Sequence, residues 1–206
     1  LGLGYNVGLL GQIRAGWRQT WLNTDLSTGV PTESFPSKTS ESFGAIYAGL
    51  DFDQMDRLYF PTSGWQSRIG YFYSPSEDYS KLVANFMVAH SFGDYVINSK
   101  LSYQGSPSGE LPAYDAGTLG GFINLSGYTA NQLVGDNITY GNVRVEKIIG
   151  HMPMGLRGDM RLGVALEAGK VGNPYTETEL NGWITSGAVY VGGETPLGPV
   201  YLGYGR

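Results

Sequence analysis

Hydrophobic and polar residues alternate with a period of two along most of the chain. In residues 1–9 every odd position is apolar and every even position is glycine or asparagine. Such alternation places successive side chains on opposite faces of a β-strand. Glycine, proline, serine and threonine interrupt the pattern at intervals and mark turns and loops. The pattern predicts about ten strands, over roughly residues 1–9, 12–21, 42–53, 65–73, 81–88, 95–104, 137–148, 158–170, 182–193 and 200–206.

The predicted strands have the length that a tilted strand needs to cross a bilayer, about 9 to 13 residues. Their connections also differ systematically in length. Short ones at Gly11, Gly93 and 195–199, with the somewhat longer 55–64 and 150–157, alternate with the loops 26–40, 105–136 and 172–181. Because short turns of outer-membrane barrels are typically periplasmic and long loops extracellular, we expect the first strand to run toward the periplasm. The fold class is therefore all-β, an antiparallel transmembrane β-barrel, with residues 1–206 forming part of one barrel domain.

The composition supports a membrane environment. Only 15% of the residues are charged, and the chain has 32 glycines and 15 tyrosines. No apolar run is long enough for a membrane helix, so membrane contact must come through strands. A soluble β-sandwich is the alternative, but its strands are shorter and its outer face richer in charge. Aromatic residues suited to an interfacial girdle are Trp17, Trp21, Trp65, Tyr71 and Tyr73.

The chain offers little that resembles catalysis. The nearest match to a nucleophile elbow, residues 105–109, carries Pro107 at the nucleophile position. His90 and His151 have no neighbouring second ligand, and there is no cysteine, so we expect no catalytic residue, metal or cofactor. A net charge of -5 without a Lys/Arg cluster argues against nucleic acid. Charged residues on the polar faces either line a pore or form internal salt bridges: Arg14, Arg18, Arg68, Arg144, Glu146, Arg161 and Glu167.

Three motifs remain to be interpreted: Phe60-Pro61-Thr62-Ser63-Gly64, the segment 125–128 and the segment 195–205. Together they resemble the membrane domain of the BamA/TamA/FhaC superfamily, a sixteen-stranded barrel. The resemblance implies that the long loop 105–136 folds back into the lumen. It also implies that the predicted strands correspond to strands six to fifteen of the family barrel, and that strands one to five and strand sixteen are absent from this sequence. The lumen-inserted motif 119–128 would comprise Leu119, Gly120, Gly121, Phe122, Asn124, Leu125, Ser126, Gly127 and Tyr128.

Ser126 departs from the family pattern, in which insertases and transporters carry arginine at this position. The extended loop string instead resembles the barrels fused to patatin-like phospholipases. This resemblance implies a bacterial outer-membrane anchor or type V (autotransporter-like) secretion domain, with lipid hydrolysis in an absent N-terminal serine hydrolase domain. The alternative is the barrel of a protein translocase or insertase. Expected partners are outer-membrane lipid, the rest of the barrel and N-terminal periplasmic or secreted domains, with a homodimer left open.

Overall fold

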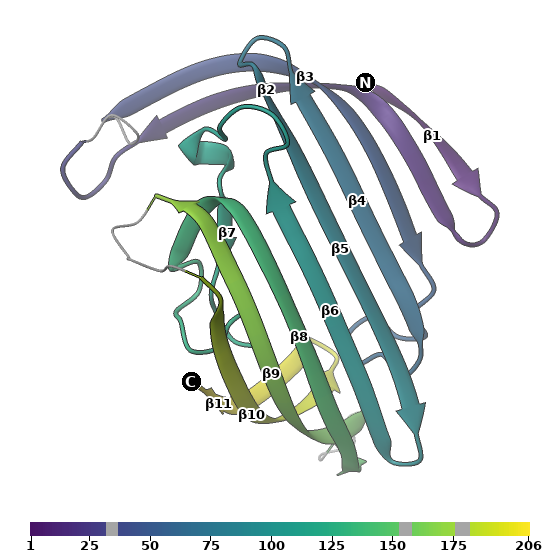
Figure 1. The fold of residues 1–206 in the computed structure, drawn as a ribbon. Helices are drawn as coiled ribbons and strands as arrows, with labels where there is room; N and C mark the ends of the chain where they lie inside the picture. Colours follow the sequence, from purple (N-terminus) through teal and green to yellow (C-terminus); the bar gives the residue numbers. More distant parts are fainter. Residues whose placement is uncertain (32–36, 153–157, 176–181) are drawn as a thin grey trace.

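The computed structural model describes residues 1–31, 37–152, 158–175 and 182–206, so parts of the predicted connections 26–40, 150–157 and 172–181 lie outside the described residues. Ten long strands follow one another, with a short strand and a 3-10 turn inside the longest loop (Figure 1). The elements are β1 (Gly2–Val7), β2 (Gly11–Asp25), β3 (Lys38–Asp53), β4 (Gly64–Ser74), β5 (Tyr79–Phe92), β6 (Tyr95–Gly105), η1 (Ala113–Asp115), β7 (Gly117–Leu119), β8 (Leu133–His151), β9 (Asp159–Pro174), β10 (Ile184–Thr195) and β11 (Gly198–Gly205).

All strands belong to one antiparallel sheet in which sequence neighbours pair, in the order β1-β2-β3-β4-β5-β6-β8-β9-β10-β11. The sheet is strongly curved, and β1 and β11 lie at its two ends without pairing with each other (Figure 1). The predicted all-β, antiparallel barrel architecture is thus confirmed as an open barrel wall. The described strands do not close into a ten-stranded barrel.

Several strands are longer than the sequence prediction. β2 continues to Asp25 rather than Trp21, β3 begins at Lys38 rather than Ser42, and similar extensions occur around the longest loop. β8 begins at Leu133 rather than near Asn137, and β9 continues to Pro174 rather than Lys170. Both extensions are stabilised by pairing, because β8 adds β7 on one side and pairs Gly135 with Pro174 of β9 on the other. The segment Val134-Gly135-Asp136 has no regular apolar alternation, so periodicity does not reveal it as strand.

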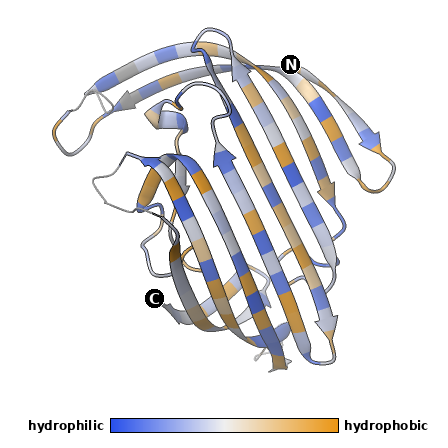
Figure 2. Ribbon diagram, in the orientation of Figure 1, coloured by the Kyte–Doolittle hydropathy of each residue, from blue (hydrophilic) through white to orange (hydrophobic). Residues whose placement is uncertain are grey.

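The two faces of the sheet have the reverse of a soluble protein's polarity. Large apolar side chains on the convex face are exposed, with Leu166 at 75% and Leu202 at 81% of their maximum area. On the concave face, Arg161 and Glu146 are 0% and 1% exposed. The alternation is visible along individual strands (Figure 2). The predicted girdle residues Trp17, Trp21, Trp65, Tyr71 and Tyr73 are all exposed.

The turns separate the two ends of the sheet as predicted, with one exception. Tight turns join β1 to β2 and β5 to β6, with Gly8 and Gly93 in the left-handed region at φ 56° and 59°. The first tight turn comprises residues 8–10, so Gly11, where the sequence placed this turn, is instead the first residue of β2. At the opposite end, beside the long loops, β4 and β5 are joined by only residues 75–78, where Asp78 has φ 50°. Long connections therefore do not occupy every position at that end. No helix in the part of the chain that the structure describes is long and apolar enough to span a membrane.

Candidate functional site: the inward loop and the lumen network

The loop between β6 and β8 folds back against the concave face of the sheet (Figure 1). Leu119 and Leu125 are 1% and 0% exposed. They form an apolar cluster with Leu133, Ile138, Tyr140 and Val171 from β8 and β9. At Gly127, an added Cβ would lie 2.9 Å from the carbonyl carbon of Arg206, so the loop also touches the end of β11. The segment 119–128 therefore lies inside the curve of the sheet.

The loop motif has an unusual backbone held by its own hydrogen bonds. Ile123 and Leu125 have φ of 56° and 79°, a region that β-branched and bulky residues rarely adopt. Gly120 and Gly121 also have positive φ, at 122° and 113°. The Gly121 amide donates to Tyr128 O at 3.0 Å and the Asn124 amide to Gly121 O at 3.0 Å. Such conformations persist only where surrounding contacts fix them, so this is a specifically shaped segment.

Glu167 of β9 connects the loop to the barrel wall. Its carboxylate accepts a hydrogen bond from the Ser126 amide at 2.6 Å and one from the Ser186 hydroxyl of β10 at 2.7 Å. The Tyr140 hydroxyl of β8 lies 2.8 Å from its other oxygen. Hydrogen bonds to a charged acceptor are roughly twice as strong as neutral ones. A buried carboxylate thus binds the loop through neutral donors, without the arginine that the superfamily resemblance associates with this position.

The Ser126 hydroxyl also has a structural partner. It accepts a hydrogen bond from the Ile123 amide at 2.9 Å, which closes the turn of the motif. The hydroxyl of Ser126 therefore binds within its own loop, while its amide binds Glu167 on the barrel wall.

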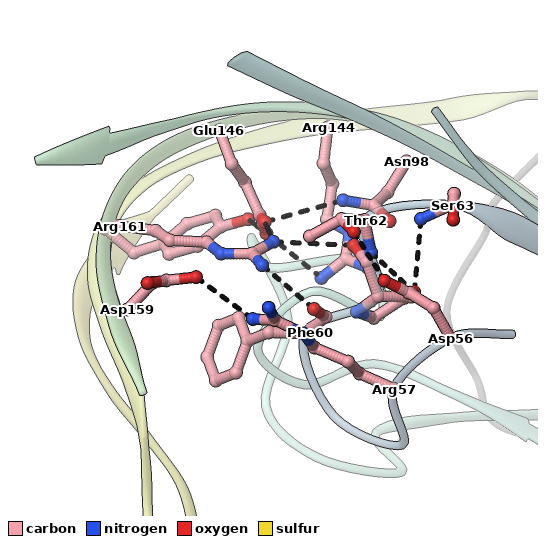
Figure 3. A network of polar contacts seen from close by, with 12 residues as sticks. Asp56, Arg57, Phe60, Thr62, Ser63, Asn98, Arg144, Glu146, Asp159 and Arg161 are labelled. Atoms are coloured by element: carbon pink, nitrogen blue, oxygen red, sulfur yellow. Dashed lines mark hydrogen bonds and ion pairs between the residues drawn. The ribbon is translucent and has the colours of Figure 1, made fainter. Parts of the chain in front are cut away.

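A second network joins β6, β8, β9 and β10 nearer the tight-turn end (Figure 3). Glu146 accepts hydrogen bonds from Arg161 Nη1 at 2.8 Å and from the Tyr190 hydroxyl at 2.6 Å. Arg144 Nη1 lies 3.6 Å from the same carboxylate, and Asn98 Nδ2 is at 3.4 Å. Burying an ion is unfavourable unless it is paired and hydrogen-bonded, so each of these charged side chains depends on the others for its stability.

This network holds the turn between β3 and β4 inside the sheet. Arg161 Nη2 donates to Phe60 O at 2.9 Å, Nη1 lies 3.4 Å from Pro61 O, and the guanidinium lies 5.3 Å from the centroid of the Phe60 ring. Phe60 is only 3% exposed. Nearby, Arg57 Nη1 forms an ion pair with Asp159 at 3.0 Å. Residues about 100 positions apart in the sequence therefore meet here, as Figure 3 shows.

Asp56 organises the same turn from its solvent side. Its carboxylate accepts hydrogen bonds from the Thr62 hydroxyl and from the amides of Thr62 and Ser63, at 2.8 and 3.1 Å for the amides. Partial burial opposes ionisation, but these hydrogen bonds and the Arg57 charge hold the pKa of Asp56 below its ordinary 3.8. The motif 60–64 is thus fixed by Asp56 on one side and by Arg161 on the other.

The remaining candidate residues lie elsewhere. Arg14, Arg18 and Arg68 line a cavity of about 540 Å³ on the concave face of β2 to β5. Arg68 pairs with Asp51 at 3.2 Å, and Arg18 lies over the Phe72 ring at 5.3 Å. The predicted set of seven charges is therefore divided between this cavity, the Glu146 network and the Glu167 site. Among the described residues no group of His, Asp and Glu has the spacing of a metal site.

Sequence reasoning missed the neutral partners of both carboxylates. Tyr140, Ser186, Tyr190 and Asn98 are hydrogen-bonded to Glu167 or Glu146. The only signal in the sequence was the odd or even position of each residue within its strand, which places it on the polar, concave face of the sheet.

Comparisons with known proteins give a fold match only. No protein-family model and no curated protein matches the sequence. Among solved structures, BamA from Haemophilus ducreyi lacking POTRA domains 1-3 is similar, with a TM-score of 0.78 and 15% sequence identity. The match covers 100% of this chain and 49% of that chain, so the chain spans about half the length of its structural neighbour. At this identity the similarity establishes a BamA-like barrel fold.

Proposed function

We propose that this chain forms part of the wall of an outer-membrane β-barrel that assists the insertion or passage of polypeptides. The observation that carries the proposal is the inverted polarity of the sheet together with the inward loop bound to Glu167. An apolar outer face with a polar, hydrogen-bonded interior is the arrangement that a hydrocarbon solvent requires. The BamA-like fold favours the insertase or translocase class over a simple anchor.

The unpaired edges of the sheet suggest further strands. β1 and β11 each present a row of backbone groups without a partner strand in the described residues. In hydrocarbon each unsatisfied group is strongly unfavourable, so an open sheet edge is not stable there. We infer that additional strands of the parent protein close the barrel, and that domains related to the POTRA domains of the structural neighbour precede it.

A second candidate is the membrane anchor of a patatin-like phospholipase. Ser126, in place of the superfamily's arginine, favours it. The sequence encoded upstream of Leu1 separates the two candidates. POTRA-type repeats would support the insertase or translocase, whereas a Gly-x-Ser-x-Gly hydrolase region would support the anchor.

Membrane embedding is tested with Val164→Arg in the full-length parent protein. Val164 is 49% exposed on the outer face of β9, between Val145 and Val189. We expect the substitution to lower the free energy of unfolding from a bilayer by about 2–4 kcal/mol. The matched control is Leu197→Arg in the β10–β11 turn, where the side chain is 101% exposed and the effect should be near zero. Equal, small effects at both positions would place the outer face in water and refute the proposal.

The activity itself is tested in vesicles. The full-length protein, reconstituted in lipid vesicles, should accelerate the membrane insertion of an unfolded outer-membrane barrel supplied outside, measured by protease protection. Empty vesicles and vesicles holding an unrelated barrel serve as controls. Insertion no faster than in these controls would reject the insertase function and leave the anchor.

A further inference from the structure

The outer face of β6, β8, β9 and β10 carries a groove that the lumen networks do not use. It has a volume of about 370 Å³, within the usual ~300–1,000 Å³ of ligand pockets. Its floor lies at Gly141 of β8 and Ala168 of β9, which pair directly with each other. The longer side chains of Leu101, Val143, Leu166 and Trp183 surround it, each 49% to 75% exposed. Small residues between large ones therefore create a notch in a largely apolar surface.

The next row of side chains toward the long-loop end has a different chemistry. Tyr103, Thr139 and Lys170 lie side by side on β6, β8 and β9, because Thr139 pairs with both of the others. The Tyr103 hydroxyl donates to Asn137 Oδ1 at 3.2 Å, and Lys170 is exposed. Among the described residues Lys170 takes part in no ion pair. Tyrosine, tryptophan and lysine together are typical of the boundary between hydrocarbon and headgroups.

The apolar notch and the adjacent row that contains Lys170 are together complementary to an amphiphilic molecule. A cation at the headgroup level lies one row from an apolar notch, so a single molecule with an anionic headgroup and a hydrocarbon chain would satisfy both. A lipid without charge would gain only the notch. A protein partner is less favoured. Within the bilayer the apolar side chains around the notch already contact lipid, so replacing lipid by an apolar protein surface gains little free energy.

We propose that this groove, the Gly141 groove, is a binding site for an anionic lipid, with its headgroup phosphate at Lys170 and an acyl chain over Gly141 and Ala168. The inference rests on the proposed function, since it requires the outer face to lie in a membrane. It adds a specific lipid site to that function, on a defined sector of the barrel wall.

The experiment measures quenching of Trp183 by brominated lipids in the full-length protein, with every other tryptophan, including Trp17, Trp21 and Trp65, replaced by phenylalanine. Phosphatidylcholine vesicles contain equal mole fractions of either brominated phosphatidylglycerol or brominated phosphatidylcholine. We expect the anionic lipid to bind about fivefold more strongly beside Trp183, the factor that one lysine near a bilayer surface contributes. A ratio near one in this protein would overturn the proposal.

Two variants assign the preference to the groove. Lys170→Gln should reduce the ratio to about one, while Lys147→Gln, at an outer-face lysine near the opposite end of β8, should leave it unchanged. Ala168→Leu should reduce quenching by both lipids, and Ala48→Leu on the outer face of β3 should not. If Ala168→Leu does not fold, the two lysine variants decide. An unchanged ratio in Lys170→Gln contradicts the proposal.

Failure of the proposed function would look different. If the outer face is not in the membrane, neither brominated lipid would quench any of the four tryptophans within residues 1–206. Quenching without headgroup preference would leave the barrel intact as a membrane domain and reject only the lipid site.

Discussion

Replacing Arg161 by methionine should destabilise the barrel more than any other single loss of charge in the described strands. Arg161 is 0% exposed and donates to Glu146, Phe60 O and Pro61 O. Methionine preserves most of the side-chain volume. It leaves the Glu146 carboxylate, which is 1% exposed, without its closest cation, and the Phe60 and Pro61 carbonyls without the Arg161 donor. Removing one partner of such a buried pair lowers the free energy of unfolding by about 3–5 kcal/mol.

The assay is equilibrium urea unfolding of the full-length protein in lipid vesicles. Arg68→Met is the matched control, because Arg68 lies on the same face but its ion pair with Asp51 is 55% and 42% exposed. An exposed pair contributes about 0–1 kcal/mol, so the control should remain close to the unmodified protein. If the two variants unfold at the same urea concentration, the Glu146 network does not hold the 60–64 turn, and the reasoning is wrong.

Three further predictions concern the loop and the turn. Gly127→Trp should lower the unfolding free energy by about 1–3 kcal/mol, because its Cβ would lie 2.9 Å from the Arg206 backbone. Glu167→Gln should release the inward loop, with a loss of roughly 2 kcal/mol and faster proteolysis within 119–128. Asp56 has a lowered pKa, so its stabilisation is complete above pH 3.8 and is lost as the pH falls through the folded-state value. Asp56→Asn should therefore reduce stability at neutral pH and weaken its dependence on pH below 3.8, measured by unfolding at several pH values.

Each of these has a contrary result. A melting temperature unchanged by Gly127→Trp would place the loop outside the lumen. Proteolysis of the Glu167→Gln variant at the original rate would mean that the apolar cluster of Leu119 and Leu125 alone secures the loop. An Asp56→Asn variant with the original pH profile would show that another carboxylate controls acid stability.

The sequence determined the strands and their faces. Alternation in β9, from Met160 to Lys170, specifies which side chains face outward, since a shift of one residue would reverse every side chain. The asymmetry of turns and loops likewise specified the two ends of the sheet. These are local properties, because side-chain parity and turn chemistry depend on neighbouring residues in the chain.

The tertiary structure alone decided which polar residues work together. Arg161 was one of seven candidate charges in the sequence, and nothing local indicated that it would bind a turn 100 residues earlier. The sequence showed that Ser126 departs from a family motif. Only the fold showed that its amide donates a hydrogen bond to Glu167. The curvature of the sheet brings such groups together on its concave face, and their separation depends on the curvature and register of many strands. The alternation in the sequence describes each strand, whereas the networks belong to the sheet as a whole.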